Sequence, residues 1–324
     1  MLLIFVCAFV ALATAEDKKL LQANEITMRA YNAVMMPKKQ MDDHRAKKAV
    51  VKAYHTSAGT LDGSYRLLQV DENNYFSEFR VGSYQHVDIK KDGKDYLFDN
   101  APFPPLASDY FFWIIPPHTV IIGPEDAVRS IKNEQVNGEQ AVCVDFDTIE
   151  GKRKSNEEAC FSKAHDWLLR TTMREHEYHW SKYVPFRGKN WPTHADAYEH
   201  GAKVLEADFE FSDVPQLTSA QIVVPAFVKE QPQCGTRTPP KQMSAPDPQY
   251  PAGVHIRQVL HVIVKAKVGD NGDVTAAQVQ QSVGDPFDKA AIDAVKKWRF
   301  APGLCDGAPI ETTTEVEVDF ATNP

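Results

Sequence analysis

The sequence predicts an α+β protein with a long antiparallel sheet, one helix and an apolar insert, followed by a small strand–strand–helix–strand unit. The first observation is a series of short runs with large apolar residues at near-alternate positions, such as YRLLQVD and YFSEFRV, separated by hairpin-turn sequences. The second is a length of 324 residues, which favours two domains over one. The third is a cluster of prolines between Pro215 and Pro251 that separates the two patterns.

The N-terminal part begins with a helical pattern and continues with strand patterns. Residues 17–36 carry apolar side chains at helical spacing, and Pro37 follows them. Strand-like segments then occupy residues 47–59, 63–71, 74–82, 84–93, 95–100, 130–147, 152–161, 167–180 and 202–214. We therefore place the first domain at residues 16–213.

An aromatic and aliphatic insert interrupts these strands at residues 102–128. A short helix or loop laid over the open face of a curved sheet would use residues of this kind. The sequence favours two alternatives, a ligand cavity or side chains that fill the concave face. The candidate residues are Phe103, Leu106, Tyr110, Phe111, Phe112 and Trp113.

Residues 214–245 are rich in proline and lack periodicity, so we expect a semi-stiff connector there. The last part, residues 246–324, then contains an alternating strand from Leu260, an Asp-Asn-Gly turn, a returning strand, a helix and a final strand. Asp285 is placed to cap that helix, with Pro286 at its first position. Trp298 and Phe300 follow the helix, where they can close the core between helix and sheet.

The N-terminal run MLLIFVCAFVALATAED is apolar and too short to span a bilayer. It contains a small-x-small pattern at Ala13-Thr14-Ala15, which is typical of a secretory signal cleaved after residue 15. An uncleaved anchor is the alternative. No later segment is long and apolar enough to cross a membrane, so we expect an exported, soluble protein.

Four cysteines remain after removal of such a signal, which suggests two disulfides in an oxidising compartment. Three pairings are open in principle. Cys143 and Cys160 lie in two strand-like stretches joined by a charged turn, so a hairpin can bring them opposite each other. We therefore expect Cys143–Cys160 and Cys234–Cys305.

The C-terminal part resembles the TonB C-terminal domain family over about residues 246–320. The residues that carry this resemblance, in order, are Tyr250-Pro251, Asp270-Asn271-Gly272, Ala290 to Trp298-Arg299-Phe300, Pro302 and Asp306-Gly307. The resemblance implies a periplasmic module with a core around Tyr250, Pro251, Trp298 and Phe300.

In this family the edge strand pairs with an extended segment of an outer-membrane protein, so the resemblance implies an envelope or outer-membrane protein as partner. The candidate edge residues are Thr312, Thr314, Val316, Val318 and Phe320. The same edge also allows a homodimer.

The N-terminal part resembles, by its element order and aromatic insert, the LolA and LolB lipoprotein carriers. This resemblance implies a half-barrel sheet closed by an apolar lid, whose cavity holds a lipid or acyl chain. It provides an alternative function, that of a lipid or lipoprotein carrier.

Signals for enzymatic chemistry are weak. No Walker loop, dinucleotide fingerprint or nucleophile elbow is present. His176 and His179 are three apart in a strand-like run and therefore on opposite faces, which is wrong for shared metal ligation. We expect no catalytic residues, no metal and no cofactor, and a metal-dependent enzyme is a remote alternative. The formal net charge of −8 without a basic patch excludes nucleic acid as an expected partner.

Overall fold

The computed structural model describes residues 14–38, 40, 43–56, 59–150, 153–173 and 176–321. The predicted signal, residues 1–15, lies almost wholly outside the described residues. The chain forms two compact units, one of Met1–Gly93 with Pro104–Phe227 and the other of Lys94–Phe103 with Val228–Pro324. The predicted α+β class is confirmed.

The first unit contains α1 Ala15–Val34, β1 Arg45–Thr56, β2 Gly59–Asp71, β3 Asn74–Val81, β4 Tyr84–Lys91, α3 Leu106–Ile114, β6 Ala127–Val136, β7 Glu139–Glu150, β8 Arg153–Ser162, β9 Leu168–Met173, β10 His176–Phe186, β11 Lys189–Glu199, β12 Ala202–Asp213 and the 3₁₀ helix η1 Ser219–Gln221. The second unit contains β5 Lys94–Asp99, β13 Lys229–Glu230, β14 Arg237–Thr238, β15 Lys241–Ser244, β16 Leu260–Val268, β17 Val274–Gln281, α4 Asp285–Val295, β18 Arg299–Ala301, β19 Gly303–Cys305, β20 Ala308–Ile310 and β21 Thr312–Phe320.

Helix α1 starts at a capping box. The Thr14 amide donates to the Asp17 carboxylate at 2.8 Å, and the Asp17 amide donates to Thr14 Oγ1 at 3.1 Å. One stripe of the helix is buried, at positions spaced three or four apart: Ala23, Ile26, Thr27, Ala30 and Val34. The helix therefore has one face committed to the core, as its periodicity predicts.

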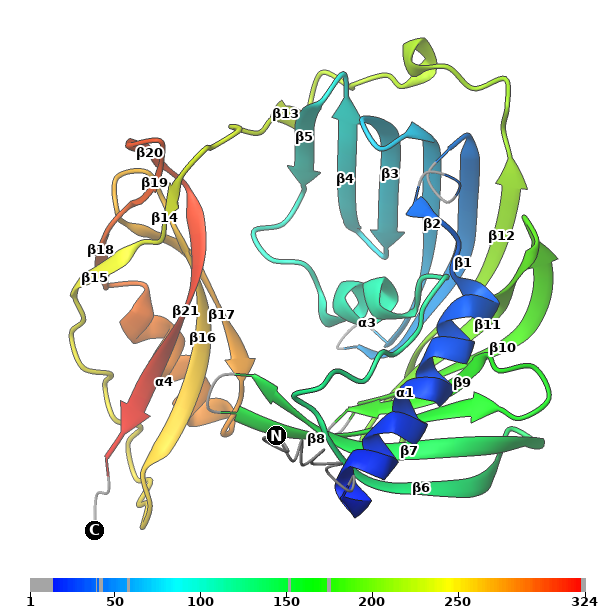
Figure 1. Cartoon of the computed structure of the whole chain (residues 1–324). Coiled ribbons are helices and arrows are strands. Elements are labelled where there is room, and N and C mark those ends of the chain that lie inside the picture. Colours follow the sequence, from blue (N-terminus) through cyan, green and yellow to red (C-terminus); the bar gives the residue numbers. More distant parts are fainter. Residues whose placement is uncertain are drawn as a thin grey trace, which may run out of the picture. The chain divides into compact units, whose positions relative to one another are not determined.

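The first unit is built on one curved antiparallel sheet with the strand order β4-β3-β2-β1-β12-β11-β10-β9-β8-β7-β6. Strand β1 pairs with β12 as well as with β2, so the two ends of this part of the chain meet in the middle of the sheet. The sheet curves around α3 but does not close, since β6 pairs only with β7 among the described strands (Figure 1).

Helices α1 and α3 cover the same face of the sheet. Trp191, Ala195 and Ala197 occupy alternate positions of β11 and are buried, so they share one face. The Trp191 indole donates to the Val34 carbonyl of α1 at 2.9 Å, and α3 contacts β10, β11 and β12. The apolar face of the half-barrel is therefore occupied by helices.

The second unit is a two-layer module in which α4 packs on a sheet of order β17-β16-β21. Alternate residues of β16 are fully buried, as the sequence predicts: Val262, Val264, Ala266 and Val268. Trp298, 5% exposed, and Phe300, 6% exposed, complete this core. The Trp298 indole also donates to the Pro246 carbonyl at 3.1 Å, so its one polar group is satisfied.

The N-cap of α4 differs from the prediction. Gly284, not Asp285, holds this position, with a φ of 119° that other residues rarely adopt. Asp285 is already helical, and Pro286 follows it inside the first turn. Among the described residues, no side chain makes a capping hydrogen bond to this helix start; the Asp288 carboxylate instead accepts from the amide of Val283, which precedes the N-cap, at 3.0 Å.

The segment expected to be a connector supplies short strands to the second unit. β13 pairs with β5, β14 with β19 and β15 with β18. The Cys234–Cys305 disulfide joins this segment to β19, and the Asp306 carboxylate accepts from the amides of Gly235 and Thr236 at 3.0 and 2.7 Å. From Lys229 onward the segment is thus part of the module.

Candidate binding surfaces

The first surface is helix α3, which lies in the hollow of the curved sheet (Figure 1). Its inner side is filled: the Phe111 ring lies 4.5 Å from that of Phe79 and 5.1 Å from that of Tyr65. Tyr110 and Phe111 are buried, 6% and 0% exposed. These two residues fill the concave face.

Three large apolar residues of α3 are partly exposed: Leu106 by 58%, and Phe112 and Trp113 by 46% each. The Phe112 ring also lies 5.7 Å from that of Phe79, and the Trp113 ring 6.0 Å from that of Tyr178. Large apolar side chains that stay exposed at the surface of a domain are a common mark of a ligand or partner site. Phe103 is half-buried and belongs to the second unit. Of the five candidate residues on α3, two are buried and three are partly exposed.

The second surface is β21 at the edge of the small sheet. All nine of its residues pair with β16 without a register shift. The residues that face the core are Thr312, Thr314 and Val316, which are half-buried, and Val318 and Phe320, which are buried. Tyr250 holds this end of the strand, with its ring 6.0 Å from that of Phe320, while Pro251 is half-buried.

The opposite face of β21 is acidic. Glu315, Glu317 and Asp319 point outward at alternate positions and are exposed. His261 Nδ1 of β16 lies 2.7 Å from both Glu317 Oε1 and Asp319 Oδ1. Hydrogen bonding to Asp319 and the two negative charges raise the pKa of His261. Histidine and carboxylates are ligand types that divalent metals accept, but this trio lies fully at the surface, and we describe it as part of a charged face.

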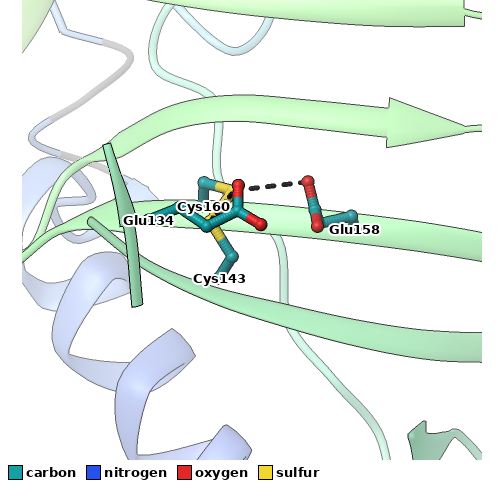
Figure 2. Close-up of side chains that lie close together, drawn as sticks. All are labelled: Glu134, Cys143, Glu158 and Cys160. Carbon is teal, nitrogen blue, oxygen red and sulfur yellow. Dashed lines mark hydrogen bonds between the residues drawn. A yellow bond between two sulfur atoms is a disulfide. The ribbon is translucent and has the colours of Figure 1, made fainter. Parts of the chain in front are cut away.

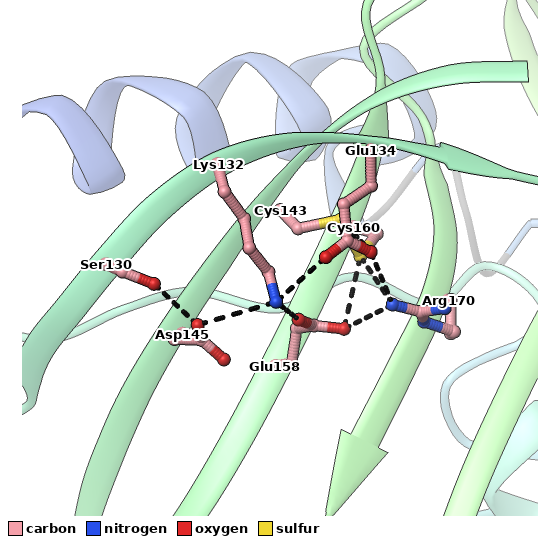
Figure 3. Close-up of a disulfide and its surroundings, with 8 residues drawn as sticks. All are labelled: Ser130, Lys132, Glu134, Cys143, Asp145, Glu158, Cys160 and Arg170. Atoms are coloured by element: carbon pink, nitrogen blue, oxygen red, sulfur yellow. Dashed lines mark hydrogen bonds and ion pairs between the residues drawn. A yellow bond between two sulfur atoms is a disulfide. The ribbon is translucent and has the colours of Figure 1, made fainter.

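A third feature surrounds the Cys143–Cys160 disulfide, which the structure contains as predicted. Glu134 and Glu158 lie beside the two sulfurs (Figure 2). Lys132 Nζ lies 2.8 Å from Glu134 and 2.9 Å from Glu158, and Arg170 pairs with the same two carboxylates (Figure 3). A hydrogen bond from Lys132 holds the pKa of Glu134 below its usual range.

This network is structural rather than metal-binding. A disulfide offers no thiolate to a metal, and both carboxylates already have cationic partners. Sequence reasoning predicted the disulfide but missed the charges around it. The alternation of side chains along a strand could have indicated these charges. Once Cys143 lies opposite Cys160, side chains two residues away on the same strands, such as Glu158, lie on the same face as the disulfide.

Among the described residues, no helix combines the length and the apolar character needed to cross a membrane. His118 is a further titratable group of the first unit, stacked on Trp180 with ring centroids 4.9 Å apart. Burial lowers the pKa of His118 to about 4. It is therefore neutral at physiological pH and serves as a half-buried aromatic residue stacked on Trp180.

Residues 246–322 match the family described as Gram-negative bacterial TonB protein C-terminal. The resemblance expected from the C-terminal motifs is thus confirmed, and the match supports a protein of the bacterial envelope. A comparison with curated proteins found no match.

Several solved structures are similar to this chain at low sequence identity. A LolA superfamily protein from Nitrosomonas europaea is 10% identical, with 62% of this chain and 97% of that chain covered and a TM-score of 0.38. A DUF1329 family protein from Desulfovibrio piger is 9% identical, with 63% and 97% covered and a TM-score of 0.41. The MucA/MucB complex of Pseudomonas aeruginosa is 11% identical, with 76% and 88% covered and a TM-score of 0.29. The LolA superfamily protein among them is in line with the resemblance of the N-terminal part expected from the sequence.

Proposed function

We propose that the chain is a non-enzymatic periplasmic binding protein whose C-terminal module engages an extended segment of an envelope or outer-membrane protein. The observation that carries this proposal is the regularity of β21, which pairs with β16 from Thr312 to Phe320 and with no second strand among the described residues. Such an edge presents a row of backbone N–H and C=O groups to which another strand can add.

The other edge of the same sheet is a poorer template. The ladder between β16 and β17 contains two register shifts, at Ile263/Val264 and Lys267/Val268. Bulges of this kind bend a strand and interrupt its hydrogen-bonding row, which protects an edge from added strands. A partner strand is therefore expected on β21 and not on β17.

Hydrogen exchange of the full chain tests this proposal. The probe is a peptide of five Gln-Val repeats, roughly long enough to cover β21 and free of charge. Strand addition should slow exchange of the β21 amides that face the free edge, because they gain carbonyl partners. The β17 amides serve as the internal control and should keep their rates.

The proposal fails if saturating peptide leaves β21 exchange unchanged or if protection appears in β17 instead. Two further peptides exclude non-specific burial. Each carries N-methyl groups at alternate residues, one at odd and one at even positions, so each lacks the backbone donors of one of its edges. The two peptides should differ in how strongly they protect β21, because only one edge of the added strand faces β21.

The partly exposed apolar residues of α3, Leu106, Phe112 and Trp113, support a second candidate function, the carriage of a lipid or acyl chain. Protein purified without detergent should then contain lipid, detectable by mass spectrometry. Phe112→Glu should remove it, since a charge disfavours contact with an acyl chain. Val50→Glu is the matched control, because Val50 is 66% exposed on β1 and points away from the buried side of that strand. Equal lipid content in all three proteins would contradict this function.

A further inference from the structure

The outward face of β21 restricts which strand can add to its edge. Its residues at odd positions are Thr313, Glu315, Glu317 and Asp319, and all four are exposed. An added strand places its own outward residues directly beside these positions, with Cβ atoms about 4.5–5.5 Å apart. Three successive acidic neighbours would thus act on a partner at every second residue.

Neighbouring cations only partly neutralise this face. On β16, Lys265 is the partner of Glu315 across the ladder, and Lys267 lies 2.9 Å from Glu311. The four acids Glu311, Glu315, Glu317 and Asp319 exceed these two lysines by two charges while His261 is neutral, and by one charge when His261 is protonated. Strand β17 adds no charge, since its sequence is VTAAQVQQ. The excess negative charge lies on the strand that carries the free edge.

The same acids disfavour pairing with a second copy of this chain. In an antiparallel pair, directly opposite residues point to the same face of the sheet. A two-fold pairing centred on Glu317 sets Glu315 against Asp319 and Glu317 against itself, and one centred on Val316 sets Glu315 against Glu317. Like charges directly opposite each other are destabilising, so the edge is protected from self-association while it remains open to other strands.

We infer that the occupant of this edge is an extended segment of another protein with lysine or arginine at alternate positions. This inference rests on the proposed strand addition and adds the chemistry of the partner. The basic side chains would lie beside Glu315, Glu317 and Asp319, while the residues between them would continue the apolar face formed by Val316, Val318 and Phe320. Opposite charges across neighbouring strands stabilise such pairs.

Three matched peptides test the inference on the full chain: five repeats of Lys-Val, Gln-Val or Glu-Val. Fluorescence anisotropy at low salt should show the lysine peptide binding on the order of tenfold more tightly than the glutamine peptide, and the glutamate peptide more weakly than both. The difference between lysine and glutamine peptides should largely disappear near 1 M salt, where the Debye length is about 3 Å.

Two charge-matched variants locate the effect. At protein concentrations where it is monomeric, E315Q/E317Q/D319N should bind lysine and glutamine peptides with similar affinity and keep the wild-type affinity for the glutamine peptide. D247N/D285N/D293N removes three exposed acids elsewhere in the same unit and should keep the lysine preference.

The outcomes separate the inference from the function it rests on. Equal binding of lysine and glutamine peptides to the wild type, or a preference that survives in E315Q/E317Q/D319N, overturns the charge inference and leaves strand addition intact. Binding of the lysine peptide that is unaffected by N-methylation at either set of alternate residues overturns both, since it shows charge attraction without a ladder.

Discussion

Gly272 lies in the turn between β16 and β17 with a φ of 83°, and a Cβ at this position would lie 1.9 Å from the Phe300 carbonyl oxygen. The Gly272 carbonyl also accepts from the Phe300 amide at 2.9 Å, which ties the turn to the strand after α4. We expect Gly272→Ala to destabilise the module by several kcal/mol, because backbone strain adds to a clash with backbone that cannot move aside. Hydrogen exchange of the buried β16 amides in increasing urea measures this.

Gly307 provides the control, since its φ is 86° and nothing lies within 4 Å of an added Cβ. Gly307→Ala should cost only the conformational strain, about 1–2 kcal/mol. If the two variants lose the same free energy of unfolding, the close approach of residue 272 to Phe300 does not contribute to stability, and the prediction is wrong.

His118 predicts a pH dependence of stability in the first unit. Its pKa is lowered to about 4 in the folded protein, so below the ordinary value near 6.5 the unfolded chain takes up a proton that the folded chain does not. The stability of the folded state with respect to His118 is greatest above about pH 7, where the side chain is neutral in both states. It is lost as the pH falls from 6.5 toward 4. Between pH 7 and pH 5 the loss should be about 1 kcal/mol, allowing for partial exposure.

Replacement of His118 by phenylalanine keeps the stack on Trp180 and removes the titration. The difference in free energy of unfolding between His118→Phe and wild type, measured in urea, should therefore grow as the pH falls. His261 has a raised pKa and acts in the opposite direction: it favours the folded state at low pH, and this is lost as the pH rises through the raised pKa. A His118→Phe difference that is constant with pH would contradict the prediction.

At the scale of elements, the segment around β14 depends on a disulfide more than on its ladder. β14 forms only two residue pairs with β19, whereas the Cys234–Cys305 disulfide closes a loop of 71 residues. We expect the Cys234→Ala/Cys305→Ala variant to lose about 4 kcal/mol, and removal of Cys143–Cys160, with its separation of 17, to cost about 3 kcal/mol.

Hydrogen exchange distinguishes local from global effects of this change. In the Cys234→Ala/Cys305→Ala variant, the amides of Arg237 and Thr238 should exchange much faster than in the wild type. The exchange rates of the β16 amides should change much less, because β16 lies in the core. Uniform acceleration across β14 and β16 would show instead that the disulfide supports the whole module.

The elements differ in how far the sequence specifies them. The alternation in β16 and the hairpin that pairs Cys143 with Cys160 follow from local rules, and both are confirmed. Strand β14 has two residues and no pattern of its own; it exists because tertiary contacts hold it. Helix α3 reads LASDYFFWI, and its nearly continuous apolar run does not reveal that Phe111 is fully buried while Phe112 and Trp113 remain 46% exposed.

The candidate sites show the same division at the scale of the molecule. The edge strand could be placed from the C-terminal motifs and matches β21 in its bounds. The acidic row on that strand is readable from the sequence, but its significance depends on knowing that β16 covers only one side of β21. The ion pairs around Cys143 and Cys160 join residues from four strands, so they depend on a register that no single segment specifies.

The acidic row also predicts how the whole molecule associates with itself. If the charges of Glu315, Glu317 and Asp319 keep two β21 edges apart, E315Q/E317Q/D319N should form dimers at concentrations where the wild type does not, because the glutamines remove the repulsion and leave the backbone edge free. Sedimentation velocity on both proteins measures this, with D247N/D285N/D293N as the control for net charge. Added Gln-Val peptide should dissociate the dimer, since it competes for the same edge. Equal self-association of all three proteins would show that something other than charge keeps the edge free.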